Sequence, residues 1–275
     1  MPAIIDTHCH VDTSSMALCD SKLDELENSM EKSGITAAVV MPFAWIGFNP
    51  ILELETLVNC VSKHPRLKPM LCYDKNTGID CKQIINELLE CDNVAGVKFF
   101  TGYDLYGPLD GEIASILDLI EKKGKVAKFH TGAAARTERS LLRYCSNPHD
   151  FDELAVTRPN LKIDCAHFMA PNHIVMAPVL DKNHNIFSDL SGLIDQFDNE
   201  QDNPYAGFVR YRLADALAYL PNTNQLMFGS DFPFCNQTEM IAFIESFFDE
   251  YGFSDEHKNR IWFESAAELY GFTGI

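Results

Sequence analysis

Two histidines one residue apart, His8 and His10, stand at the end of an apolar run near the N-terminus. Residues two apart on a β-strand point to the same side, so both imidazoles face one way while Cys9 points outward to the helices. A neutral imidazole in an apolar interior needs a hydrogen-bonding partner or a metal. The motif by itself is short, and it fits a structural pair as well as it fits two metal ligands.

Three later apolar runs also end in a residue that can titrate: His130, His167 and Asp231. A single polar residue at the end of a strand is usually a hydrogen-bonding residue of the loop. Four histidines and one aspartate at the ends of different strands need a common explanation, and a divalent-metal site with nitrogen and oxygen ligands provides one. Such ligands suit zinc and also accept manganese, iron or cobalt.

The elements that must position these residues are eight short apolar runs rich in Val, Ile, Leu and Phe, as in buried parallel strands. We predict strands at Ala3–Asp6, Ile35–Met41, Leu67–Tyr73, Val94–Phe99, Val126–His130, Leu161–Ala166, Asn185–Leu190 and Gln225–Gly229. Amphipathic stretches lie between the runs. We predict helices at Leu23–Ser33, Ile51–Lys63, Cys81–Glu90, Gly111–Lys123, Phe151–Thr157, Val175–Lys182, Ala206–Tyr219 and Thr238–Tyr251, and a final helix at Asp255–Tyr270.

Strict alternation of strand and helix predicts an α/β protein with a parallel sheet and helices outside it. Eight units over 275 residues favour a closed (β/α)8 TIM barrel with an additional C-terminal helix, and an open doubly wound sheet is the alternative. No linker or repeat divides the chain, so we expect one domain over residues 1–275. Active sites of such barrels lie at the carboxyl ends of the strands, where the histidines and Asp231 are predicted to meet.

Taken in order, several segments resemble the amidohydrolase superfamily, and most of all its branch of amidohydrolase-related (family 2) metal-dependent hydrolases. The resemblance covers nearly the whole chain, through Ile5-Asp6-Thr7-His8-Cys9-His10, Gly96-Val97-Lys98-Phe99-Phe100, Phe129-His130-Thr131-Gly132, Pro159-Asn160-Leu161-Lys162-Ile163, Ala166-His167, Phe228-Gly229-Ser230-Asp231-Phe232-Pro233 and a C-terminal helix at 264–272. The ligands of one metal that it implies are His8, His10, His130 and Asp231. It also implies that His167 polarises the substrate or positions water, and that Asp231 accepts the proton of the metal-bound water.

Lys98 departs from the simplest form of this resemblance. In two-metal members of the superfamily, a carboxylated lysine after the fourth strand bridges the metals, and Lys98 lies inside the fourth predicted strand. A lysine ammonium cannot ligate a metal until it loses its charge. Lys98 is therefore a candidate for a second-metal residue or for a residue that pairs with an acidic ligand or with the substrate.

Three classes of function follow from these residues. The first is a metal-dependent hydrolase of an amide, lactone or ester in a small molecule, which we favour. The second is a lyase of the same family, a decarboxylase or hydratase acting on a carboxylated ring, which cationic or aromatic groups at the mouth would favour. The third is a barrel that binds without catalysis, and a base beside the metal argues against it.

The loops after the strands are expected to select the substrate. The loop Pro42–Phe48 predicts an apolar or aromatic wall, or a loop packed on its neighbours. An arginine after the fifth strand, Arg136, Arg139 or Arg143, could clamp a carboxylate, although surface pairing is the ordinary role of each. The segment Asp195–Asn203 is acidic and expected to be solvated. His64, His149, His173, His184 and His257 are expected to be structural or surface residues.

Composition limits the partners. A net charge of −18 argues against nucleic acid and anionic membranes, since both bind clustered Lys and Arg, and leaves a small molecule and a homo-oligomer as expected partners. Nine cysteines without a CxxC pair predict reduced thiols in a cytoplasmic protein. The first residues lack a basic signal-peptide region. The uncharged stretch 34–52 is interrupted by Pro42 and Pro50, so we expect a strand, a loop and a helix start rather than a membrane span.

Overall fold

The computed structural model describes residues 3–43, 48–134, 140–194 and 206–274. Within them, eight parallel strands form one sheet in the order of the chain. The strands are β1 (Ile5–Val11), β2 (Ala37–Pro42), β3 (Leu67–Tyr73), β4 (Gly96–Phe99), β5 (Val126–Phe129), β6 (Lys162–Cys165), β7 (Ile186–Asp189) and β8 (Leu226–Met227).

The sheet curves round until its last strand meets its first. The backbone amide of Thr7 in β1 donates to the carbonyl of Phe228 after β8 at 3.1 Å, and Cys9 forms an isolated parallel bridge with Phe232. Asp6 strengthens this seam, because its Oδ1 accepts from the amides of both His8 (3.1 Å) and Ser230 (2.9 Å). The predicted (β/α)8 barrel is confirmed, and the open sheet is excluded.

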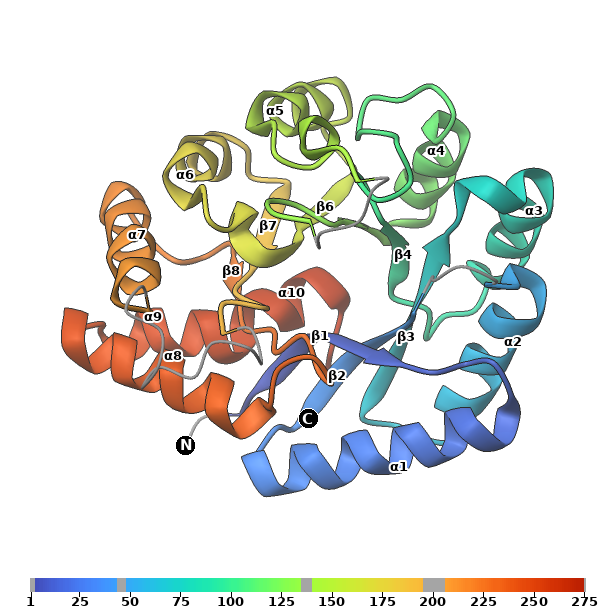
Figure 1. The fold of residues 1–275 in the computed structure, drawn as a ribbon, viewed down its shortest axis with the longest axis horizontal. Coiled ribbons are helices and arrows are strands. Elements are labelled where there is room, and N and C mark those ends of the chain that lie inside the picture. The colour runs from blue at the N-terminus through green and yellow to red at the C-terminus, as the bar shows by residue number, and fades with distance from the viewer. Residues whose placement is uncertain (1–2, 44–47, 135–139, 195–205, 275) are drawn as a thin grey trace.

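Helices surround the strands (Figure 1). The main helices are α1 (Met16–Ser33), α2 (Pro50–Val61), α3 (Gly78–Leu88), α4 (Ala114–Lys123), α5 (Pro148–Thr157), α6 (His173–Lys182), α7 (Ala206–Tyr219) and α8 (Gln237–Tyr251). Short 3₁₀ turns are η1 (Lys75–Thr77), η2 (Leu142–Tyr144) and η3 (Ala166–Met169). The predicted final helix is a continuous run of α9 (Asp255–Asn259), the π-helical η4 (Arg260–Glu264) and α10 (Ser265–Tyr270). None of the described helices is both long enough and apolar enough to cross a membrane.

Several predicted boundaries were wrong, among them the end of β1 and the start of α1. The strand was predicted to end at Asp6, but it continues to Val11 and pairs with β2 through His10 opposite Met41. Polar side chains on a core strand concealed this continuation in the sequence. Helix α1 begins at Met16 rather than Leu23, because the Ser15 side chain accepts a hydrogen bond from the amide of Leu18 and caps the helix there.

Glycines end α1 and α4. Gly34 and Gly124 adopt φ values of 73° and 64°, and their amides bond to carbonyls of the last helical turn. A left-handed residue at this position is accessible to glycine with little strain. Each glycine therefore turns the chain from the end of a helix into the next strand of the barrel.

Candidate metal centre

Three side chains converge at the carboxyl end of the barrel. His8 and His10 lie on β1, and Asp231 follows β8. The Nε2 atoms of the two histidines are 3.2 Å apart, and Asp231 Oδ1 lies 3.5 Å from His8 Nε2 and 3.4 Å from His10 Nε2. One ligand atom from each residue lies within 4.8 Å of the others. This two-nitrogen, one-oxygen arrangement fits part of a divalent-metal site.

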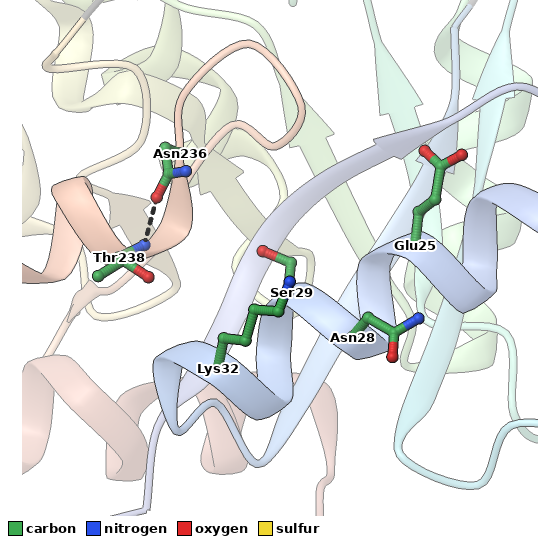
Figure 2. Close-up of a pocket in the computed structure, with 6 residues that line it drawn as sticks. All are labelled: Glu25, Asn28, Ser29, Lys32, Asn236 and Thr238. Atoms are coloured by element: carbon green, nitrogen blue, oxygen red, sulfur yellow. Dashed lines mark hydrogen bonds between the residues drawn. The ribbon is translucent and has the colours of Figure 1, made fainter.

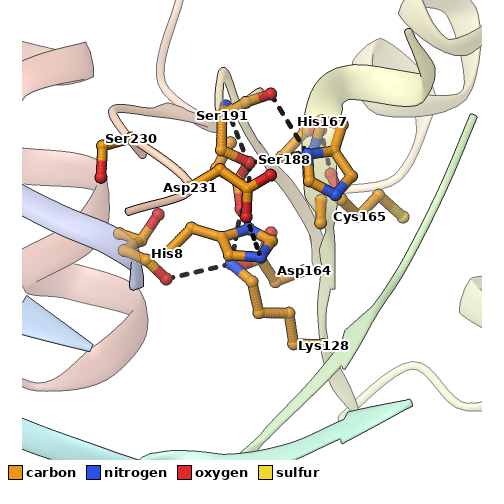
Figure 3. A network of polar contacts seen from close by, with 12 residues as sticks. His8, Lys128, Asp164, Cys165, His167, Ser188, Ser191, Ser230 and Asp231 are labelled. Atoms are coloured by element: carbon orange, nitrogen blue, oxygen red, sulfur yellow. Dashed lines mark hydrogen bonds and ion pairs between the residues drawn. The ribbon is translucent and has the colours of Figure 1, made fainter. Parts of the chain in front are cut away.

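Backbone geometry aims Asp231 at the histidines. Asp231 has a φ of 70°, in the left-handed region, and its amide donates to the carbonyl of His8 at 2.9 Å. The amide of Phe232 donates to Ser230 Oγ at 2.9 Å, so a second hydrogen bond stabilises the turn that contains Asp231. The ligand-bearing turn after β8 is thus tied directly to the ligand-bearing strand β1, and Figure 3 shows the Asp231 carboxylate directed toward the His8 ring.

The electrostatic environment favours the ligand forms of His8 and Asp231. Burial and the nearby Lys98 ammonium hold the pKa of His8 well below its usual range, which keeps the imidazole neutral. Burial opposes ionisation of Asp231, but the imidazoles of His8 and His10 outweigh it, and the pKa of Asp231 is lower than usual. Neutral imidazoles and an ionised carboxylate are the states that bind a metal cation.

His130 is close to this group without joining it. Its Nε2 donates to the carbonyl of Ala133 at 2.9 Å, and its ring lies 4.9 Å from that of His167 and 4.8 Å from that of Tyr103. The nitrogen left for a metal is Nδ1. The role of His130 as a fourth ligand therefore stays a prediction.

His167 lies beside the three converging residues. It follows β6 in η3, where His167, Phe168 and Met169 all have positive φ, at 66°, 44° and 55°. Its ring centroid is 4.8 Å from that of His8. A Cβ atom on Gly192 would lie 3.1 Å from His167 Nδ1 and 3.3 Å from Asp231 Oδ2, so the glycine fits between these two side chains.

A buried ion network that the sequence analysis did not predict lies next to His8. Lys128 on β5 places its Nζ 2.7 Å from Asp164 Oδ2 on β6 and 2.5 Å from Asp189 Oδ2 on β7. Asp189 Oδ2 is in turn 3.1 Å from His8 Nδ1. One feature of the sequence could have indicated this network, namely a charged residue, Lys128, inside an otherwise apolar core run. A buried charge requires a partner of opposite charge.

A second group of potential ligands, His8, His167 and Asp189, does not fit a metal. Their ligand atoms lie within 4.8 Å of one another. However, the Lys128 ammonium is already 2.5 Å from Asp189 and supplies the positive charge that a metal would bring. A second cation there would face strong repulsion at short range.

Lys98 is buried near the converging side chains, with Nζ 3.4 Å from His8 Nε2 and 5.6 Å from the centre of the Phe100 ring. Burial and the Lys128 ammonium lower its pKa to about 8. Both roles considered for Lys98, contact with the substrate or an acidic ligand and support of a second metal, stay predictions.

Aromatic rings line the mouth around His10. The ring centroids of Phe43, Phe100 and Phe234 lie 5.2, 6.4 and 5.8 Å from that of His10. The predicted wall from the loop after β2 is therefore present at Phe43, while residues 44–47 lie outside the described residues. Arg136, Arg139 and the segment Asp195–Asn203 lie outside them as well. Arg143 stacks on Tyr144 at 4.5 Å.

The remaining predictions concern residues outside the mouth. His173 Nδ1 donates to the carbonyl of Phe168 at 2.8 Å, and His64 pairs with Glu27, which fits structural roles. Cys9 points outward as expected, with Sγ 3.8 Å from Gln237 Nε2 on α8. The nine cysteines, all within the described residues, form no disulfide bonds.

A polar pocket between α1 and the start of α8 lies on the outside of the barrel (Figure 2). It is lined by Glu25, Asn28, Ser29, Lys32, Asn236 and Thr238. Its lining contains none of the histidines or cysteines that could bind a metal tightly. The chemistry is concentrated at the barrel mouth instead.

Comparisons with known proteins give a matching family model and similar solved structures. A family model described as Amidohydrolase matches residues 5–272. Similar solved structures include a 2,6-dihydroxybenzoate decarboxylase complexed with 2,6-dihydroxybenzoate, with a TM-score of 0.70 at 12% identity, covering 99% of this chain and 100% of that one. A 5-carboxyvanillate decarboxylase from Sphingomonas paucimobilis gives 0.69 at 13% identity, covering 99% and 100%.

A third solved structure bears the name of a hydrolase. It is a probable 2-pyrone-4,6-dicarboxylic acid hydrolase from Acinetobacter baumannii with citric acid bound, with a TM-score of 0.62 at 16% identity, covering 98% of this chain and 99% of that one. No curated protein matches the sequence. At these identities the structural similarity establishes the barrel fold, and it leaves the reaction open.

Proposed function

The chain belongs to the amidohydrolase family, and from that premise we propose that it is a metal-dependent hydrolase of an amide, lactone or ester in a small molecule. The observation that carries the proposal is the convergence of His8, His10 and Asp231, with Asp231 Oδ1 within 3.5 Å of both imidazoles. Zinc is the metal we propose, because it prefers imidazole and carboxylate ligands.

Each side chain has a separate role in the proposed reaction. His8, His10 and Asp231 would hold the metal, with His130 as the fourth ligand, and the bound metal would lower the pKa of a coordinated water to about 7. Asp231 is ionised and reached by solvent, with 18% of its side chain exposed, so it can accept the proton of the attacking water. His167, beside Asp231, orients the carbonyl or the water.

A second candidate, a lyase acting on a carboxylated ring, is favoured by one specific observation. The rings of Phe43, Phe100 and Phe234 gather around His10, and the Lys98 ammonium lies beside them. Aromatic faces bind a planar ring, and a cation binds its carboxylate. Two of the similar solved structures carry the names of decarboxylases.

One screen separates the two reactions. The zinc-loaded protein is mixed with a panel of lactones, esters, amides and hydroxylated aromatic carboxylates, while the release of protons, of ammonia or amine, and of carbon dioxide is recorded in parallel. The proposed hydrolase releases protons from a lactone or ester, or ammonia or an amine from an amide, without carbon dioxide. Release of carbon dioxide from an aromatic carboxylate, with no hydrolysis of any substrate, would contradict the hydrolase and support the lyase.

A further inference from the structure

Asp189, the last residue of β7, is completely buried and uses its two carboxylate oxygens on different partners. Oδ2 lies 2.5 Å from Lys128 Nζ and 3.1 Å from His8 Nδ1. Oδ1 accepts from the backbone amides of His167 and Ser191, both at 3.0 Å, and from the Ser191 hydroxyl. One carboxylate therefore contacts the His8 ring, on β1, and the backbone amide of His167, which follows β6.

The contacts at His8 determine which ring nitrogen carries its proton. His8 Nδ1 has Asp189 Oδ2 at 3.1 Å and Ser191 Oγ at 2.9 Å. An ionised carboxylate can only accept hydrogen bonds, and Lys128 keeps Asp189 ionised by direct contact. The proton of a neutral His8 ring therefore belongs on Nδ1, which leaves the Nε2 lone pair facing His10 and Asp231.

The contacts at His167 lead to the same result through a hydroxyl. The Ser191 hydroxyl hydrogen is directed to Asp189 Oδ1, so Ser191 Oγ offers its remaining lone pairs to its other neighbours. His167 Nδ1 lies 2.8 Å from Ser191 Oγ and 3.2 Å from the Ser191 carbonyl oxygen, which is only an acceptor. His167 Nδ1 must donate, and its Nε2 is left as the acceptor.

We propose that Asp189 and Ser191 are positioning residues that keep the ring proton of both His8 and His167 on Nδ1, so that one buried unit prepares a metal ligand and a neighbouring base. Figure 3 shows Ser191 directed toward His167, with His8 and Lys128 nearby. The tasks assigned to the two Nε2 atoms rest on the proposed function, whereas the proton positions do not.

Asp164 offers a matched control for this proposal. Like Asp189, it is a completely buried carboxylate that contacts Lys128 Nζ. Its other described partner is the Tyr270 hydroxyl, and it bonds to neither His8 nor His167. Asp164→Asn therefore removes the same charge from the same lysine while leaving both histidine contacts intact.

The test uses metal-free protein with ¹⁵N-labelled histidine rings and long-range ¹H–¹⁵N correlation spectra, which distinguish the two neutral tautomers. Single substitutions His8→Asn and His167→Asn assign the two rings. We expect both rings to be Nδ1–H in the parent and in Asp164→Asn. In Asp189→Asn, we expect His8 to become a mixture that includes Nε2–H. An Nε2–H tautomer in the parent, or unchanged pure Nδ1–H rings in Asp189→Asn, overturns the proposal.

Ser191→Ala covers the case in which Asp189→Asn does not fold. It removes the hydroxyl and keeps the backbone carbonyl of residue 191, 3.2 Å from His167 Nδ1, as the weaker acceptor. We therefore expect a minor Nε2–H population of His167 to appear, while His8 keeps its contact with Asp189. A His167 ring that stays uniformly Nδ1–H in this variant contradicts the role of Ser191.

A zinc titration gives a second readout. Loss of a carboxylate that supports a metal-binding histidine typically weakens metal affinity by about 10–100-fold. We expect this loss in Asp189→Asn and an affinity near the parent value in Asp164→Asn, and equal losses in the two variants would contradict positioning by Asp189. If the parent binds no zinc, the proposed function fails, and the ring spectra still decide the proton positions.

Discussion

We propose for Asp231 two tasks that usually require different residues, metal binding and proton acceptance. Its Oδ1 lies within 3.5 Å of both His8 and His10, and 18% of its side chain is exposed at the mouth. A carboxylate so placed can contact a metal and still receive a proton from water, because it has two oxygens with separate lone pairs. We therefore assign both tasks to this residue.

Asp231→Asn separates shape from basicity. The amide keeps the size and one oxygen but has no affinity for a proton at neutral pH, so turnover should fall by about two to four orders of magnitude. The measurement is kcat with a substrate found in the screen, alongside zinc content. Near-normal turnover at full metal occupancy would show that Asp231 is not the general base, and His167 would be the next candidate.

The site residues divide into those that the sequence reveals and those that it conceals. His8, His10 and Asp231 were predictable because each ends or continues an apolar run at the carboxyl side of the barrel. Lys128, Asp164 and Asp189 were missed, since a charge inside a core strand does not identify its partner, which comes from another strand. Their mutual contacts exist only after β5, β6 and β7 lie side by side.

The turns after the strands connect the elements and also position the side chains of the site. The turns after β6, β7 and β8 contain left-handed residues at His167, Gly192 and Asp231. The alternation of apolar and amphipathic segments predicted the strands and helices, because burial of each strand is encoded in its composition. It could not predict these φ values, which depend on hydrogen bonds to other elements. Helix starts were missed for a related reason, since capping side chains such as Ser15 and Asn147 act outside the periodic pattern.

Gly192→Ala tests the turn after β7. A Cβ atom there would lie 3.1 Å from His167 Nδ1, at a φ of 68°. Gly252 has the same φ, and a Cβ atom added to it would meet no atom within 4 Å, so Gly252→Ala is the matched control. Both variants should lose about 1–2 kcal/mol of unfolding free energy in urea, and only Gly192→Ala should also lose kcat. Equal kcat in the two variants would show that the close contact is unimportant.

The loop after β4 carries a pH-dependent contribution to stability. Burial and the nearby Asp74 carboxylate raise the pKa of Asp104 to about 7 from its ordinary value of 3.8. Between these pH values the folded state binds more protons than the unfolded state, so Asp104 makes the fold less stable as pH rises. Asp104→Asn cannot ionise. Urea unfolding should show the variant gaining stability over the parent from pH 4 to pH 7, with a constant difference above that. A difference independent of pH would contradict the raised pKa.

The C-terminal segment of the chain contacts the buried ion network inside the barrel. The Tyr270 hydroxyl of α10 donates to the buried Asp164, and Lys68 Nζ of β3 donates to the carbonyls of Tyr270 (2.8 Å) and Gly271 (2.9 Å). The last helix is therefore coupled, through Asp164 and Lys128, to the network that contacts His8.

Tyr270→Phe removes one donor from this connection. Asp164 Oδ1 already has no partner among the described residues, so loss of the hydroxyl leaves the buried carboxylate with only Lys128. We expect a loss of about 1–3 kcal/mol in the free energy of unfolding in urea. Tyr219→Phe is the control, because Tyr219 is 53% exposed on α7 and should change stability by less than about 0.5 kcal/mol. Equal effects would rule out the connection.

We propose that one divalent metal is held at the barrel mouth by His8 and His10 together with Asp231. Zinc titration of the chelator-stripped protein by calorimetry tests this, in the parent and in the double variant His8→Ala, His10→Ala, with far-UV circular dichroism as the check on folding. We predict one zinc ion bound per parent chain, and none bound by a double variant with the parent's dichroism spectrum. Parent-like zinc binding by the double variant, or no binding by the parent, would contradict the claim.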